Sequence, residues 1–154
     1  MINKEKVLKL LNKARYYHNC LCREEKAIKI CNKILKDDPE NRDALLIKAG
    51  SLKYVHKGKG SFLLLTHIIE KWPDHWEAYY LIGVLLFNAD EKQAMENFTK
   101  SMDRKKTFDN CIAAAQLAYF MNDETYITYL SSAQELDPPR YVNYMDKYWE
   151  WELC

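Results

Sequence analysis

Residues 76–98, WEAYYLIGVLLFNADEKQAMENF, decide the fold of this chain. Apolar residues recur every three or four positions on both sides of a short polar stretch, and this period predicts two helices. We expect them over about 75–88 and 91–103, packed as a pair. Gly83 in the first helix and Ala94 in the second are small, so the two helices are able to cross closely.

A spacing of 34 residues extends this pattern over the rest of the chain. Pro39 and Pro73 are 34 residues apart, and each follows a helical stretch. Ala49 and Gly83 have the same spacing. A period in this range is typical of arrays of helix pairs, in which each pair buries its apolar face against its neighbours. Such arrays present an extended surface to another molecule, so the period indicates binding.

We predict one domain over residues 1–154, made of helix pairs and a last single helix. The pairs are expected at about 4–38, 42–72, 75–104 and 108–137, and the last helix at 140–153. The composition agrees with a folded helical protein, because 48% of the residues are hydrophobic and only 4 Gly and 4 Pro occur.

The third pair resembles the tetratricopeptide repeat (TPR) family. That family has a large residue, Leu-Gly and Tyr in its first helix, then Ala, Phe and a closing Pro in its second. The matching residues are Tyr79, Ile82, Gly83, Leu86, Ala94 and Phe98. The other pairs match more weakly in the same register, and Arg15 and Tyr126 stand where the family has a small residue. The resemblance implies an all-α fold, a TPR-like right-handed α-solenoid of about four helix pairs plus a C-terminal capping helix.

Bulky side chains mark one face of the last predicted helix. They are Tyr141, Tyr144, Met145, Tyr148 and Trp149. We interpret the helix as a cap over the open end of the array, because terminal repeats differ from internal ones. The alternative is that this face docks another chain.

Charge is unevenly distributed, although the net charge is only +1. Residues 1–60 carry 15 Lys and Arg against 7 Asp and Glu, whereas residues 61–154 carry 8 against 15. The halves are either two ordinary solvated surfaces or two oppositely charged ends that favour head-to-tail self-association.

The sequence shows no pattern of a catalytic, cofactor or metal site. A nucleophile elbow, a zinc-protease helix motif and a dinucleotide-binding glycine pattern are all missing. His18, Cys20 and Cys22 cluster, but structural zinc needs a fourth ligand and none is evident nearby. We therefore predict no enzyme activity, no cofactor and no metal.

The cysteines and the apolar runs bear on location. Five cysteines at irregular spacings indicate free thiols in a reducing compartment. No apolar run approaches the roughly 18 residues of a membrane span, and residues 1–11 lack the apolar core of a signal peptide. We expect a cytoplasmic protein with no membrane partner, and the nucleus stays open as a location.

The TPR resemblance also implies a binding site. In that family the first helix of each pair lines a concave groove that takes a peptide segment of another protein. The expected binding residues on this face are Lys9, Lys13, Tyr16, Leu46, Lys53, Tyr54, Tyr80, Val84, Phe87 and Asn88. The same face also includes Asn12, Asp43, Ile47, Gly50, Glu77, Leu81, Cys111, Ala115, Ala118 and Tyr119. They predict a groove that is apolar at its centre and basic towards the N-terminal end, suited to a segment with apolar anchors and an acidic flank.

We therefore expect a non-catalytic protein–protein interaction module: an adaptor, an assembly subunit or a dedicated chaperone. One alternative is an RNA-binding helical-repeat protein that uses the basic N-terminal half. There tyrosines that could stack on bases are interleaved with basic residues: Tyr16, Tyr17 and Tyr54 with Lys9, Lys13, Arg15, Arg23, Lys53, Lys57 and Lys59. Two narrower alternatives rest on fainter resemblances. Residues 76–139 resemble the TPR chaperones of type III secretion translocators, and residues 94–136 resemble TPR scaffold subunits of the anaphase-promoting complex.

Overall fold

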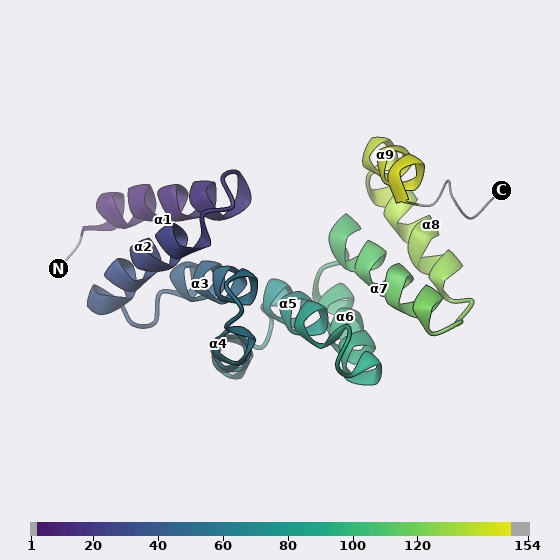
Figure 1. Cartoon of the computed structure of the whole chain (residues 1–154), viewed down its shortest axis with the longest axis horizontal. Helices are drawn as coiled ribbons and strands as arrows, with labels where there is room; N and C mark the ends of the chain where they lie inside the picture. Colours follow the sequence, from purple (N-terminus) through teal and green to yellow (C-terminus); the bar gives the residue numbers. More distant parts are fainter. Residues whose placement is uncertain (1–2, 149–154) are drawn as a thin grey trace.

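A computed structural model describes residues 3–148 as an elongated array of helices, with α1 and α9 at opposite ends (Figure 1). Nine helices and no strand occur in this part of the chain. They are α1 (Lys4–Asn19), α2 (Glu24–Asp37), α3 (Arg42–Tyr54), α4 (Gly58–Lys71), α5 (Trp76–Leu86), α6 (Glu91–Arg104), α7 (Phe108–Phe120), α8 (Tyr126–Leu136) and α9 (Pro138–Tyr148). The expected all-α solenoid is confirmed.

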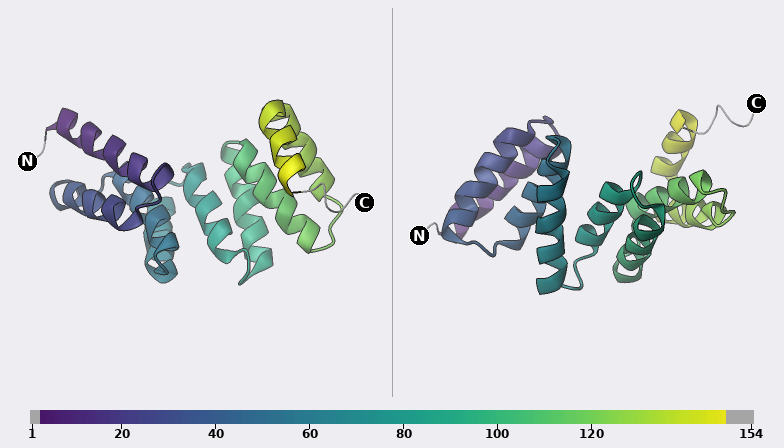
Figure 2. Two further views of the ribbon diagram at one scale, coloured as in Figure 1. Left: turned by 45° about the horizontal axis from the view of Figure 1, so that its top comes forward. Right: turned by 60° about the horizontal axis from the view of Figure 1, so that its bottom comes forward.

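Consecutive helices pack side by side as the pairs α1–α2, α3–α4, α5–α6 and α7–α8 (Figures 1 and 2). The second helix of each pair also packs on the first helix of the next. In addition, α1 contacts α3, and α3 contacts α5. The first helices therefore follow one another along the array, so side chains from different pairs meet there.

A glycine sets the crossing of α5 and α6. Gly83 lies against the ring of Phe98, and a Cβ atom on Gly83 would lie only 2.5 Å from Phe98 Cε1. Phe98 is completely buried and extends this contact into a cluster with Ala113 and Leu117 of α7. Glycine is required here because any side chain would displace the ring from a close-packed core.

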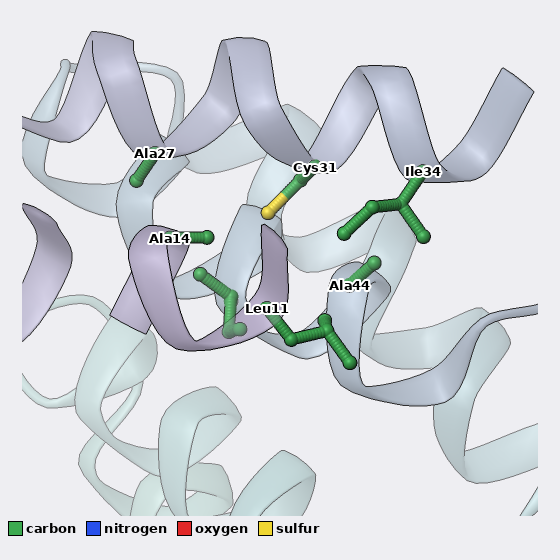
Figure 3. Close-up of a cluster of buried hydrophobic side chains, with 7 residues drawn as sticks. Leu11, Ala14, Ala27, Cys31, Ile34 and Ala44 are labelled. Atoms are coloured by element: carbon green, nitrogen blue, oxygen red, sulfur yellow. The ribbon is translucent and has the colours of Figure 1, made fainter. Parts of the chain in front are cut away.

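The first three helices close over small side chains at the N-terminal end (Figure 3). The cluster contains Leu11, Ala14, Ala27, Cys31, Ile34, Ala44 and Ile47. Ala14 is completely buried, whereas its neighbour Arg15 is not. Arg15 therefore need not fit into the crossing of α1 and α2, which explains how the repeat tolerates it. Burial also raises the pKa of the Cys31 thiol to about 12, so the thiol stays protonated.

The start of α7 is held by a buried polar network. Thr107 and Asn110 form a reciprocal capping box. Asn110 is completely buried, and its amide also donates to Ser101 Oγ at 3.1 Å and to the Lys105 carbonyl at 2.8 Å. These bonds pair buried polar groups from both helices and so fasten α7 to the end of α6.

The last helix packs on the end of the array. It begins at Pro138 rather than at residue 140, and the predicted stretch 149–153, with Trp149, lies outside the described residues. Tyr141, Tyr144 and Met145 pack against the core formed with α7 and α8. Tyr148, by contrast, is 56% exposed. Three residues of the predicted face thus behave as a cap.

Candidate functional site

The first helices of all four pairs line one hollow of about 270 Å³. Its lining residues are Arg15, His18 and Asn19 of α1, Asp43, Leu46, Ile47 and Gly50 of α3, Trp76, Glu77, Tyr80 and Leu81 of α5, and Asp109 of α7. The lining residues lie at the end of α1, within residues 43–50 of α3 and 76–81 of α5, and at the start of α7. The row of first helices thus provides a site that no single pair could form.

Seven positions of the concave face expected from the TPR resemblance line this hollow: Asp43, Leu46, Ile47, Gly50, Glu77, Tyr80 and Leu81. Of the ten expected binding residues, Leu46 and Tyr80 are among them. The other expected binding residues are Lys9, Lys13, Tyr16, Lys53, Tyr54, Val84, Phe87 and Asn88. On α1, Lys9 and Lys13 precede the residues that line the hollow, and Tyr16 directly follows Arg15. The remaining residues follow the lining residues of α3 and α5 in the sequence. Their role in binding stays a prediction.

Several of these other positions already have neighbours. Lys53 Nζ lies 4.6 Å from the ring centroid of Tyr54, and Lys9 pairs with Glu5 at 2.7 Å. Val84 and Phe87 are partly buried against the cluster around Phe98. Of the basic residues considered for RNA binding, Lys53 thus lies against the ring that was expected to stack on a base.

Sequence reasoning missed Arg15, His18, Asn19, Trp76 and Asp109 as lining residues. A signal was present at Arg15, because a charged residue replaced a small one in the repeat pattern. In the structure its guanidinium reaches Asp43 at 3.2 Å. The family pattern specifies which face of a helix is concave, but not how far along each helix the hollow passes.

The hollow also contains a histidine held in place by hydrogen bonds. His18 Nδ1 lies 2.6 Å from Glu24 Oε2 and 3.2 Å from Ser51 Oγ. A Cβ atom on Gly50 would lie 3.1 Å from His18 Nε2, so the glycine leaves room for the ring. This arrangement joins α1, α2 and α3 at the wall of the hollow.

The charges of the hollow are mostly negative and only partly paired. Arg15 neutralises Asp43, and Arg140 of α9 bonds both oxygens of Asp109, at 2.5 and 3.3 Å. Glu77 has no ion-pair or hydrogen-bond partner for its side chain within residues 3–148. Burial, and secondly the neighbouring charge of Asp43, raise the pKa of the Glu77 carboxyl above its ordinary value. Carboxylates thus outnumber arginines in the lining, and the basic N-terminal end expected for the groove stays a prediction.

Two aromatic residues flank this carboxylate on α5. Burial raises the pKa of the Tyr80 hydroxyl to about 12, so it stays a neutral donor. The Tyr80 ring is packed on Phe98, with ring centroids 6.2 Å apart. Lys105 Nζ lies 5.3 Å from the ring centroid of Trp76, a cation–π contact. The rings are therefore supported by the core and by the residue that follows α6.

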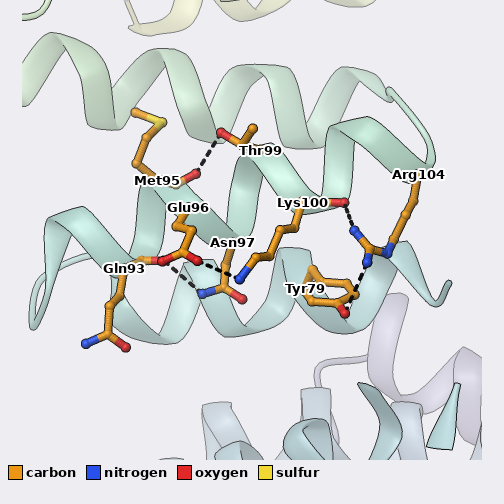
Figure 4. Close-up of polar contacts among 8 residues, drawn as sticks. All are labelled: Tyr79, Gln93, Met95, Glu96, Asn97, Thr99, Lys100 and Arg104. Atoms are coloured by element: carbon orange, nitrogen blue, oxygen red, sulfur yellow. Dashed lines mark hydrogen bonds and ion pairs between the residues drawn. The ribbon is translucent and has the colours of Figure 1, made fainter. Parts of the chain in front are cut away.

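Arg104, at the end of α6, ties the start of α5 in place (Figure 4). Its guanidinium donates to the Pro73 carbonyl at 2.6 Å, to the Lys100 carbonyl at 2.7 Å and to the Tyr79 hydroxyl at 3.2 Å. It also lies 4.1 Å from the centroid of the Tyr79 ring. The lining side chains of α5 thus project from an anchored helix, which favours a preformed site.

The surroundings of His75, directly before α5, predict a stability that depends on pH. The Nδ1 atom of His75 is buried without a partner in the described chain, and burial, followed by the charge of Arg42, lowers its pKa despite the opposing effect of Asp43. A base with a depressed folded pKa binds fewer protons folded than unfolded. Its contribution to stability is therefore complete above the ordinary pKa of about 6.5 and is lost as the pH falls towards the folded value.

We expect the free energy of unfolding to decrease between about pH 7.5 and about pH 5.5 more in the wild type than in His75→Gln. The difference in slope will stay below about 1.4 kcal/mol per pH unit, the limit for one proton. Urea titrations at both pH values measure it, and His56→Asn, at an exposed histidine, controls for the loss of a histidine as such. Equal slopes in wild type and His75→Gln would contradict the assignment.

Residues 3–148 contain no group of three or more side chains able to hold a metal ion. In the stretch weighed for zinc, Cys20 and Cys22 are exposed free thiols. None of the helices in the described range is long and apolar enough to cross a membrane.

Comparison with known proteins supports the repeat architecture. No protein-family model and no curated protein sequence matches the chain. Among solved structures it is similar to TTC0263, a TPR protein of Thermus thermophilus, with a TM-score of 0.77 and 14% identity over 88% of this chain and 77% of that one. It is also similar to MamA of Desulfovibrio magneticus, with a TM-score of 0.69 and 20% identity over 86% and 76%. A further MamA structure has a TM-score of 0.69 and 17% identity over 92% and 81%.

Proposed function

The chain has a TPR fold, and from that premise we propose that it is a non-catalytic protein–protein interaction module that binds a peptide segment of a partner in the hollow of its first helices. In this role it acts in the cytoplasm as an adaptor, an assembly subunit or a dedicated chaperone, with residues 1–154 as one binding unit. Repeat arrays of this kind bind through surfaces that several repeats build together.

One observation carries the proposal: four helices from four different pairs contribute to a single hollow. Its lining combines apolar side chains such as Leu46 and Leu81 with polar groups that orient a ligand, the composition typical of recognition sites. Because α5 is anchored by Arg104, a peptide would meet a site that needs little reorganisation.

Selection from a random peptide display library tests the proposal with the protein as it exists. Selected peptides should shift the indole N–H resonance of Trp76, which lines the hollow, on binding. Leu46→Arg, inside the hollow, should weaken their binding by roughly tenfold or more, and Leu63→Arg, at a residue that is 71% exposed on α4, should leave it unchanged. Peptides that bind without affecting Trp76 would move the site elsewhere, and selection of no peptide would remove the proposal.

A further inference from the structure

One carboxylate of the hollow has no ion-pair partner in the described part of the chain. Of its three carboxylates, Asp43 bonds Arg15 and Asp109 bonds Arg140. Glu77 is left without such a partner in the described chain, although the charges of Lys105, Arg15 and Arg42 lie near enough to oppose the rise in its pKa. The lining therefore has an acidic centre, even though it lies partly on the basic N-terminal half of the sequence.

The surroundings of Glu77 make a cationic ligand more favourable than it would be at an open surface. The side chain is partly buried, and burial is the main reason for its raised pKa. A carboxylate withdrawn from water gains more from an arriving cation than an exposed one, since the interaction is less screened. No anionic group of a partner would gain in the same way, because Asp43 and Asp109 line the same hollow.

The aromatic neighbours suit the stem and head of a long basic side chain. Trp76 directly precedes Glu77 on α5, and Tyr80 lies about one helical turn after Glu77. All three side chains line the same hollow. Lysine and arginine stems pack on apolar surface, and their charged ends favour aromatic faces. Lys105 already makes this contact with Trp76. A volume of about 270 Å³ is small for a ligand pocket and matches a side chain rather than a folded domain.

We propose that the hollow binds a lysine or arginine side chain of the partner segment, with Glu77 as its counter-ion and Trp76 and Tyr80 as the flanking rings. This inference rests on the proposed function, because it specifies the occupant of the same groove. It reverses the expectation of an acidic flank: the partner segment carries a basic anchor.

The display-selected peptides test this assignment through matched changes on both molecules. We expect peptides that shift Trp76 to contain lysine or arginine. Replacing an essential arginine by citrulline, which keeps the shape and removes the charge, should weaken binding to wild type by roughly tenfold or more. The same replacement should weaken peptide binding to Glu77→Gln by less than about threefold. Glu70→Gln, at a carboxylate on α4 outside the hollow, should behave as wild type.

The outcomes separate this inference from the proposed function. Two results would overturn the basic anchor and leave the groove intact. One is a peptide that shifts the Trp76 resonance but lacks a basic residue. The other is a citrulline replacement that lowers the affinity equally for wild type and Glu77→Gln. Absence of any peptide that shifts Trp76 would remove the groove itself. Glu77→Gln deletes a partly buried charge that has no ion-pair partner within residues 3–148, so it should not unfold the protein, and thermal unfolding checks this.

Discussion

Replacing Phe98 by alanine will lower the free energy of unfolding by about 3–5 kcal/mol, the usual cost of deleting a fully buried aromatic ring. Phe98 is 0% exposed and is the largest of the fully buried side chains in the described chain. It touches Gly83 of α5 and belongs to a cluster with α7, so its loss opens a cavity shared by two helix pairs. Close-packed neighbours on rigid helices collapse only partly into such a cavity.

Urea-induced unfolding followed by circular dichroism measures this loss. The matched control is Phe62→Ala on α4, where the ring is 38% exposed, and a change below about 1 kcal/mol is expected there. Because a repeat array is stabilised by neighbouring contacts, hydrogen exchange should increase most in α5 and α6. A loss from Phe98→Ala no larger than that of the control would show that the ring does not support the array.

Gly83→Val will be the second large effect, with a loss of about 3 kcal/mol, at the upper end for an overpacked core. A Cβ atom would meet Phe98 Cε1 at 2.5 Å and Cδ1 at 2.6 Å, far inside van der Waals contact, and valine adds two methyl groups. The ring cannot retreat, because it is enclosed by the α7 side of the cluster. The better helix propensity of a non-glycine residue recovers at most about 1 kcal/mol.

Gly58→Val provides the matched control for this prediction. Gly58 begins α4, and a Cβ atom there would have nothing within 4 Å, so stability should change by no more than about 0.5 kcal/mol. A double-mutant cycle of Gly83→Ala with Phe98→Leu measures the contact itself, since the smaller side chain should partly relieve the clash. Additive effects in that cycle would mean that the overpacking lies elsewhere.

Both variants should also disturb the hollow. The Tyr80 ring packs on Phe98, so a displaced or missing ring removes the support of one groove wall. In the folded fraction, peptide affinity should therefore fall together with stability. Groove substitutions such as Leu46→Arg, by contrast, act on binding directly.

Much of the fold could be predicted because its cause is local in the sequence. The 34-residue spacing and the small residues Gly83 and Ala94 predict a helix pair that stacks on copies of itself. In the structure Ala94 is completely buried and Gly83 lies against Phe98 of α6. The position of the Arg15 side chain could not be predicted in this way. The repeat pattern expects a small residue at position 15, whereas in the structure the buried small residue is Ala14, one position earlier. Similarly, the reach of Arg140 from α9 to Asp109 joins residues 31 positions apart, and no periodicity marks it.

The sequence by itself determined that the chain is a helical repeat array and which face of α3 and α5 is shared with neighbouring pairs, because helix formation and small-residue crossings depend on residues close in sequence. Only the tertiary structure decided where along each helix the hollow runs and what charge it has. Those properties depend on how successive pairs pack, which makes the end of α1, residues 43–50 of α3 and residues 76–81 of α5 line one hollow. They depend equally on which ion pairs form, since Asp43 and Asp109 find arginines and Glu77, within the described chain, does not.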